Sequence, residues 1–221
     1  MDDRILLDSH ERLTAEAIGR IRLEFQQGFA LLSQIDGPAV SIFGSARVSE
    51  DNPAYLAARE IAHEFASHGW AVITGGGPGV MEAANRGAQE GGGLSVGLGI
   101  ELPHEQAINR YCDLSMTFEH FYARKVCFVK PAEGFVVLPG GIGTLDELSE
   151  ALTLIQTGKV EMFPLVLFNS AYWAAIVGWL RDSALSAGMI SPSDLDLFRI
   201  TDDPCEACEL VIRRYEASGR A

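Results

Sequence analysis

Positive charge is scarce in this sequence. Its 221 residues hold 17 lysines and arginines against 30 aspartates and glutamates, for a formal net charge of −13. No run of basic residues occurs, and the three lysines are Lys125, Lys130 and Lys159. Proteins that bind nucleic-acid polymers usually present a basic patch, so the composition argues against that partner. A small anionic ligand stays compatible with an acidic chain, because a few local donors can outweigh distant charge.

Cysteines and long apolar runs are also few. The N-terminal sequence MDDRILLDSHERL lacks the basic-then-apolar order of a secretory signal. The most apolar long stretch, 163–180, is interrupted by polar residues, so we expect no membrane span. We therefore expect a cytoplasmic protein with reduced thiols at all four cysteines, which are Cys112, Cys127, Cys205 and Cys208.

Apolar runs alternate with helical patterns along most of the chain. Buried strands are predicted at 39–43, 70–74, 94–100, 113–118, 134–138, 163–168 and 197–201. Helices are predicted at 53–69, 79–92, 119–130, 144–157 and 171–180, and from about 204. This order is typical of an α/β fold with a doubly wound parallel sheet. The expected organisation is a helical extension over 1–36, with an apolar face of Ile18, Ile21, Phe25, Phe29 and Leu32, and a single domain over 37–221.

Glycines cluster in three loops, each directly after a predicted strand. The loops read FGSAR (43–47), TGGGPGVME (74–82) and LPGGIGT (138–144). Ligands of open α/β sheets bind at this edge, where glycines let backbone N–H groups approach an anion at a helix N-terminus. We therefore predict a phosphate cradle, with tight helix–strand packing as the alternative. The dinucleotide fingerprint GxGxxG is absent, since Val80 takes its last glycine position, and no P-loop occurs.

Charged side chains flank the third loop. Arg124 and Lys125 lie on the helix before it, where an arginine can bind phosphate but cannot act as a base. A solvated helix face is the alternative for this pair. Glu147 follows Thr144 by three residues, a T-x-x-E pattern that predicts a capping box. Its position equally suits a carboxylate that acts on a bound sugar, and the spacing does not decide between the two.

The glycine-rich loops and the charged residues beside them together resemble a known family. PGGIGTLDE fits the pattern PGGxGTxxE, and the Arg-Lys pair lies about twenty residues before it. With TGGGPGVM and FGSA, the region from about 38 to 182 resembles the LONELY GUY (LOG) family of nucleotide phosphoribohydrolases. The second glycine loop is one residue shorter than in the smaller plant-like members, and the added N-terminal helix is similar to the larger bacterial branch.

The resemblance implies a Rossmann-like nucleotide-binding domain and an enzyme. Family members cleave the N-glycosidic bond of nucleoside 5′-monophosphates and release the base and ribose 5-phosphate. The resemblance does not choose between AMP and cytokinin riboside monophosphates as substrates. The catalytic residues would be Arg124 and Glu147, with no metal and no cofactor. The substrate-binding residues would be Gly44, Ser45, Gly75, Gly76, Gly77, Met81, Glu82, Lys125, Gly140, Gly141, Gly143 and Thr144.

Other functions stay open at this point. A non-catalytic nucleotide or molybdenum-cofactor carrier would keep the same cradle, with Glu147 only as a helix cap. A dinucleotide-dependent redox enzyme is disfavoured by the missing fingerprint. A lysine decarboxylase would need a free lysine for its cofactor aldehyde, whereas Lys125 is better explained beside Arg124. We also expect a homodimer or a larger homo-oligomer, and no membrane partner.

Overall fold

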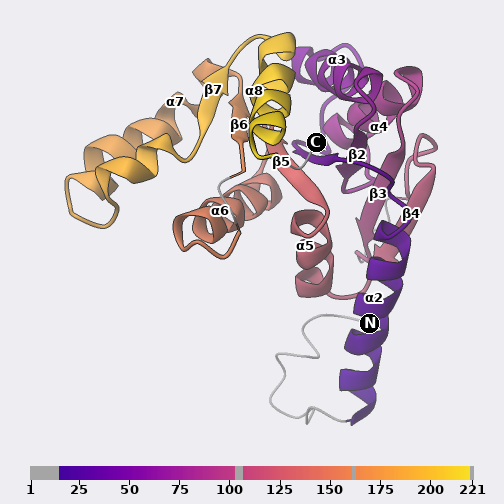
Figure 1. Cartoon of the computed structure of the whole chain (residues 1–221). Helices are drawn as coiled ribbons and strands as arrows, with labels where there is room; N and C mark the ends of the chain where they lie inside the picture. Colours follow the sequence, from indigo (N-terminus) through magenta and orange to yellow (C-terminus); the bar gives the residue numbers. More distant parts are fainter. Residues whose placement is uncertain (1–14, 103–106, 161–162, 220–221) are drawn as a thin grey trace.

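A computed structural model describes residues 15–102, 107–160 and 163–219. Seven parallel strands form a sheet in the order β4-β3-β2-β1-β5-β6-β7 (Figure 1). All seven predicted strands are present within a few residues of their expected bounds, so the predicted doubly wound parallel sheet is confirmed. The strands are β1 (Ala39–Phe43), β2 (Ala71–Thr74), β3 (Ser95–Ile100), β4 (Leu114–Phe118), β5 (Ala132–Val137), β6 (Leu165–Phe168) and β7 (Arg199–Thr201).

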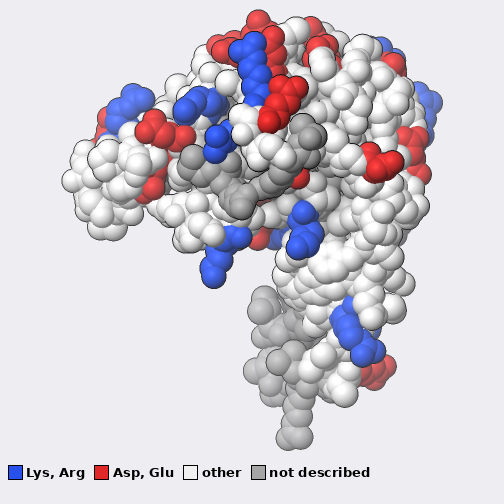
Figure 2. Space-filling view, in the orientation of Figure 1, with Lys and Arg blue, Asp and Glu red and all other residues white. Residues whose placement is uncertain are grey.

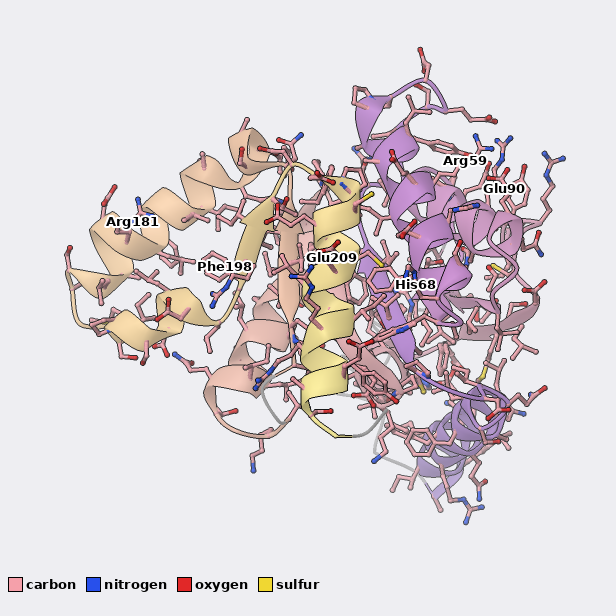
Figure 3. The ribbon with its side chains drawn as sticks, turned by 45° about the horizontal axis from the view of Figure 1, so that its top comes forward. Arg59, His68, Glu90, Arg181, Phe198 and Glu209 are labelled. Atoms are coloured by element: carbon pink, nitrogen blue, oxygen red, sulfur yellow. The ribbon has the colours of Figure 1, made fainter. Side chains whose placement is uncertain are left out.

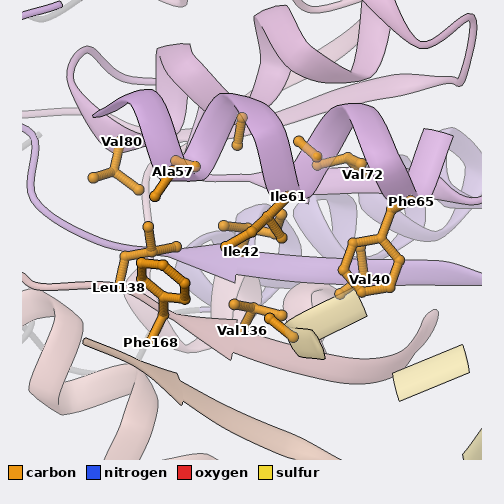
Figure 4. Close-up of a cluster of buried hydrophobic side chains, with 14 of the residues drawn as sticks. Val40, Ile42, Ala57, Ile61, Phe65, Val72, Val80, Val136, Leu138 and Phe168 are labelled. Atoms are coloured by element: carbon orange, nitrogen blue, oxygen red, sulfur yellow. The ribbon is translucent and has the colours of Figure 1, made fainter. Parts of the chain in front are cut away.

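Helices cover both faces of this sheet. One face packs against α3 (Pro53–Ser67), α4 (Val80–Glu90) and α8 (Pro204–Ala217). Figure 4 shows part of this buried cluster, where side chains of α3 meet those of the central strands. The other face packs against α2 (Ala15–Leu32), α5 (Phe121–Val129), α6 (Ile142–Gln156) and α7 (Ser170–Trp179). A π-helical segment, Leu180–Leu185, continues α7, and a 3₁₀ turn at Pro192–Asp196 precedes β7. Within the described ranges, no helix is long and apolar enough to cross a bilayer.

The strand order places a crevice beside β1. From β1 the chain builds outward through β2, β3 and β4, and then returns to the other side of β1 with β5, β6 and β7. The loops after β1 and β5 therefore diverge to opposite faces of the sheet, which opens a crevice at the carboxyl ends of these strands. Two of the three glycine-rich loops follow these two strands, and the third follows β2.

Helix α2 has the predicted apolar face, but the rest of the chain covers this face only in part. Ile18 and Phe29 are 55% and 41% exposed, Ile21 and Phe25 are half-buried, and Leu32 is buried. The buried residues are Ala17, Glu24, Gly28 and Leu32. At Gly28 a side chain would collide with Cys127 Sγ, 2.7 Å from a Cβ placed there, so glycine allows α2 to pack closely on α5. The helix extends beyond the body of the protein (Figure 1), and the domain boundary at residue 36 stays a prediction.

Candidate active site

A cavity of about 570 Å³ opens at the carboxyl ends of the strands. All three glycine-rich loops line it, together with Arg124 from α5 and Glu147 from α6. Leu102, Ile108, Phe121 and Phe128 are among its apolar lining residues. The sequence-predicted residues that it brings together are Gly44, Ser45, Gly75, Gly76, Gly77, Met81, Arg124, Gly141, Gly143, Thr144 and Glu147.

Three predicted substrate-binding residues lie outside the lining of this cavity. Glu82 accepts a hydrogen bond from the Tyr55 hydroxyl, at 3.3 Å. The Gly140 carbonyl accepts one from the Tyr172 hydroxyl. Lys125 forms ion pairs with Asp146 and with Glu150, at 2.9 and 3.2 Å. Each of the three residues therefore contacts other protein groups in this structure, and none of them lines the cavity.

Hydrogen bonds tie the glycine-rich loops together. The backbone N–H of Ser45 donates to the carbonyl of Pro139, at 3.0 Å, and the N–H of Val80 donates to the carbonyl of Ser45, at 2.9 Å. Gly79 adopts a φ of +68°, and a side chain there would collide with the Ser45 carbonyl. The first loop thus bridges the other two, and glycine is required where the chains approach most closely.

A buried polar network, which the sequence analysis did not identify, holds the second loop. The Thr74 hydroxyl donates to Asn85 Oδ1 at 2.6 Å and accepts from the N–H of Gly76 at 2.9 Å. Asn109 Nδ2 donates to the carbonyls of Gly76 and Gly77, each at 3.0 Å. Asn85 is fully buried, and a buried amide with partners at both ends fixes local geometry. No pattern in the sequence around Asn85 and Asn109 predicted this network, since each is followed directly by an arginine.

Arg124 is half-buried and packs against the sheet, rather than lying solvated on a helix face. Its Nε donates to the Leu98 carbonyl at 2.7 Å, and its guanidinium carbon lies 4.9 Å from the Phe128 ring centroid. One terminal nitrogen lies 2.5 Å from the position of a Cβ on Gly75, so only glycine leaves room for it. Burial lowers the pKa of Arg124 to about 10, and Glu147 acts in the opposite direction. The guanidinium therefore stays charged at neutral pH.

Glu147 is not the capping residue that the T-x-x-E pattern predicts. Helix α6 begins at Ile142 with Gly141 as its N-cap, and no side chain caps it. Thr144 is thus the third residue of the helix and Glu147 the sixth, so the capping-box interpretation is wrong. Burial raises the pKa of Glu147 to about 7, partly offset by the charges of Arg124 and Lys125. A carboxyl in this range can exchange a proton at neutral pH.

Lys125 is unsuited to the chemistry that a decarboxylase would need. Burial lowers its pKa, but hydrogen bonds to Asp146 and Glu150 outweigh this effect, so the pKa is raised overall. An ammonium group held by two carboxylates is a poor nucleophile, because attack on an aldehyde requires the neutral amine. Among the described lining residues of the cavity there is no lysine.

A buried contact between Glu24 and His120 joins the N-terminal helix to the helix that carries Arg124. His120, the N-cap of α5, is 3% exposed, and its Nδ1 lies 2.8 Å from Glu24 Oε2. The other Glu24 oxygen accepts a hydrogen bond from the backbone N–H of Glu119. Glu24, Glu119 and His120 have the spacing of a possible metal site. Since both Glu24 oxygens are already used, one by the Glu119 N–H and one by His120, the group is explained as a cap on α5.

The cysteines offer no reactive thiol. All four are free, and burial raises the pKa of Cys112 and Cys208 to about 12 and that of Cys127 to about 11. The pKa of Cys205 is raised as well, by burial and nearby acidic groups. Thiolates are therefore disfavoured at neutral pH, and the C-x-x-C pair at 205–208 lacks the lowered pKa of redox motifs.

A parallel sheet with glycine-rich loops at its switch point defines a Rossmann-like protein. The family model described as "Possible lysine decarboxylase" matches residues 81–211. The chain belongs to that family, the LOG family.

Its relatives carry a more specific name. A cytokinin riboside 5′-monophosphate phosphoribohydrolase of Mycobacterium marinum is 30% identical over 149 residues, which are 65% of this chain and 79% of that protein. The protein of the same name from Mycobacterium tuberculosis is 29% identical over 157 residues, covering 68% and 83%. Among solved structures, the molybdenum cofactor carrier protein of Chlamydomonas reinhardtii shares the fold, with a TM-score of 0.59, 24% identity and coverage of 82% of this chain and 99% of that one.

Proposed function

We propose that this protein hydrolyses the N-glycosidic bond of nucleoside 5′-monophosphates, releasing the free base and ribose 5-phosphate. The observation that carries the proposal is the pair of Glu147 and Arg124 on one cavity. The Glu147 carboxylate has no hydrogen-bond partner among the described residues, and its pKa is raised to about 7. Curated relatives named phosphoribohydrolases support the reaction class.

The carboxylate supplies the chemistry. Cleavage of an N-glycosidic bond develops positive charge on the ribose ring, as O-glycoside hydrolysis does. Ionised Glu147 would stabilise that charge and accept a proton from the attacking water, whose oxygen bonds to C1′. The leaving base departs with the bonding electrons and is protonated. The balance is one water consumed, with its hydroxyl on the sugar and its hydrogen on the base.

Arg124 would position the substrate and tune the carboxylate. Its Nε is used by the Leu98 carbonyl, so its terminal nitrogens are the donors that a ribose hydroxyl or phosphate oxygen could meet. Its charge also lowers the pKa of Glu147, which keeps a fraction of the carboxylate ionised at neutral pH. The backbone N–H groups of Gly143 and Thr144, in the first turn of α6, would receive the phosphate.

A panel of nucleoside monophosphates tests the reaction. We expect release of base and ribose 5-phosphate from at least one of AMP, GMP, CMP and isopentenyl-AMP. The release should fall by roughly a hundredfold or more in Glu147→Gln, the size typical of a lost catalytic acid–base group. Arg124→Ala should lose most turnover as well. The ranking within the panel would identify the base.

Binding without turnover would contradict the proposal. If AMP binds tightly and no base is released, the protein is a non-catalytic nucleotide or cofactor carrier. Fully active Glu147→Gln would remove the carboxylate from the mechanism while leaving the reaction in place. The face of the protein in Figure 2 has acidic and basic side chains interspersed without a continuous basic stripe, which supports a small ligand over a nucleic-acid polymer.

A further inference from the structure

Residues 108–112 lie against the strand that holds Arg124. Two glycines of β3, Gly97 and Gly99, face this segment, and a Cβ at either position would collide with it, at 2.5 and 2.6 Å. Glycine at both positions therefore lets the segment pack directly on the strand. Between the two glycines lies Leu98, whose carbonyl accepts the hydrogen bond from Arg124 Nε at 2.7 Å. Residues 108–112 thus support the backbone to which the guanidinium is bonded.

Asn109 joins this segment to the second glycine-rich loop. Its backbone N–H donates to the Gly76 carbonyl at 2.8 Å, and its Nδ2 donates to the carbonyls of Gly76 and Gly77, each at 3.0 Å. The same nitrogen donates to Asn85 Oδ1 at 2.9 Å, so its two hydrogens serve three acceptors. Asn109 Oδ1 accepts from the Tyr111 N–H at 3.1 Å, within the segment itself. The donors of this amide therefore hold the loop, while its acceptor holds the segment.

The loop that Asn109 holds also lies against the Arg124 guanidinium. One terminal nitrogen of Arg124 is 2.5 Å from the position of a Cβ on Gly75. Gly75 is bonded directly to Gly76, whose φ of +68° is one of several conformations open to a glycine. The hydrogen bonds from Asn109 select this conformation, and they therefore fix the position of Gly75 beside the guanidinium.

We propose that Asn109 is a positioning residue of the candidate active site, which holds β3 and the second glycine-rich loop around the Arg124 guanidinium. Asn109 itself is outside the lining of the cavity, so its effect on a substrate passes through these neighbours. The catalytic importance of Arg124 rests on the proposed function, whereas its contacts do not. Because the attraction between two charges falls with distance, a loosely held Arg124 would lower the pKa of Glu147 less than a firmly held one.

Asn109→Leu tests this role, because it keeps the approximate size of the side chain and removes its hydrogen bonds without adding charge. The pKa of Glu147 should rise above its value of about 7, since Arg124 is held less closely. NMR titration of ¹³C-labelled glutamate carboxyls measures this pKa without any turnover, and Glu147→Gln identifies the signal. For a nucleotide that the wild type cleaves, kcat should fall roughly tenfold or more, with a smaller change in KM.

Two further variants of Asn109 complete the series. If Asn109→Leu does not fold, Asn109→Ala gives the same test, because water can then reach the carbonyls that lose their donors. Asn109→Gln retains an amide, so it should recover part of the kcat and return the pKa of Glu147 towards the wild-type value.

Matched controls weaken the neighbouring helices without reaching the cavity. Asn52→Ala removes the N-cap of α3, a side chain that accepts a backbone N–H at 2.9 Å. Arg59→Gln releases the far end of α4, where Glu90 accepts a hydrogen bond from Arg59 at 2.7 Å (Figure 3). Both variants should be less stable than the wild type, yet keep its kcat and its Glu147 pKa.

The outcomes separate this inference from the proposed function. A wild-type pKa of Glu147 in Asn109→Leu, or the same change of pKa in Asn52→Ala, would overturn the positioning role. Base release by the wild type, with the pKa of Glu147 unchanged in Asn109→Leu, leaves the hydrolase and removes the positioning role. A raised pKa in Asn109→Leu, without base release from any nucleotide by the wild type, leaves the positioning role and removes the hydrolase.

Discussion

The hydroxyl of Tyr172 donates a hydrogen bond of 2.5 Å to the carbonyl oxygen of Gly140. This contact links α7 to the loop that begins α6. Tyr172 is itself fixed by Asn169, whose side chain accepts from the Tyr172 N–H at 3.0 Å. Asn169 has a φ of +84°, unusual for a residue other than glycine. Asn169, a strained residue directly after β6, therefore caps α7, and the first turn of α7 contacts the third glycine-rich loop through Tyr172.

Tyr172→Phe removes this hydroxyl and keeps the ring. We expect the free energy of unfolding to fall by about 1 kcal/mol, the usual loss for one hydrogen bond. The KM for the nucleotide should rise several-fold with a smaller change in kcat, because the glycine loop loosens while Glu147 stays in place. Steady-state kinetics would measure both. Tyr111→Phe, which loses only a contact with Arg110, is the matched control, and an equal effect there would contradict this role for Tyr172.

Glu147 should reduce stability at neutral and higher pH. Its pKa of about 7 in the folded protein lies above the ordinary value of 4.5, so the folded state keeps a proton that the unfolded state has released. Its contribution to stability is therefore lost progressively as the pH rises from 4.5 through 7. Glu147→Gln should match the wild type at pH 4 and be more stable at pH 8, by up to about 3 kcal/mol at 1.4 kcal/mol per pKa unit.

Thermal or urea unfolding at several pH values would measure this difference. The control is Asp146→Asn, which removes the neighbouring exposed acid and an ion pair to Lys125, and should give no gain at pH 8. Destabilisation of Glu147→Gln at pH 8 would show that the carboxylate supports the helix, as the capping interpretation requires. Greater stability with lost activity is the trade-off expected of a functional group held in an unfavourable environment.

Arg124 should set the acidic limb of the pH–rate profile. If ionised Glu147 is the catalytic form, kcat/KM for the wild type should rise with pH through about 7. Arg124 lowers the pKa of that carboxyl, so Arg124→Gln should move the limb to higher pH besides reducing the rate. A profile with its limb at the same pH in both proteins would contradict the coupling between the two residues.

The sequence predicted the sheet well because burial on both faces leaves a strong signal. All five residues of β1, 39–43, are buried and four of them are apolar, the pattern expected of a strand covered on both faces of a parallel sheet. The glycine-rich loops were placed correctly because they follow such strands. The T-x-x-E pattern misled because the Gly140–Gly141 turn allows α6 to begin at Ile142, two residues before Thr144.

Long-range partners could not be predicted in the same way. Glu24 is buried because His120, 96 residues later, lies against it, and nothing near Glu24 in the sequence indicates that contact. The burial of Asn85 depends on Asn109 for the same reason. The apolar residues of α2 predicted the helix and its apolar face, but not how much of that face the body of the protein covers, since Ile18 and Phe29 are exposed.

The exposed side of α2 motivates a prediction about assembly. Ile18 and Phe29, which lie on the same side of the helix, are 55% and 41% exposed and leave apolar surface there uncovered. We expect the protein to form a homodimer or a larger homo-oligomer that covers these residues. Phe29→Asp should shift the mass in sedimentation velocity towards the monomer. Leu56→Asp, at an exposed apolar residue of α3, should leave the mass unchanged. A wild type that sediments as a monomer would contradict the prediction.

Glu24 should position the helix that carries Arg124. Its carboxylate binds the Glu119 N–H and His120, which together begin α5 four residues before Arg124. Glu24→Ala should lower the free energy of unfolding by about 3 kcal/mol or more, because it leaves His120 buried without its partner. Glu24→Gln keeps an acceptor for the Glu119 N–H and should recover part of both stability and activity. If α5 is held in place without Glu24, kcat/KM in Glu24→Ala would equal that of the wild type under conditions where the variant remains folded.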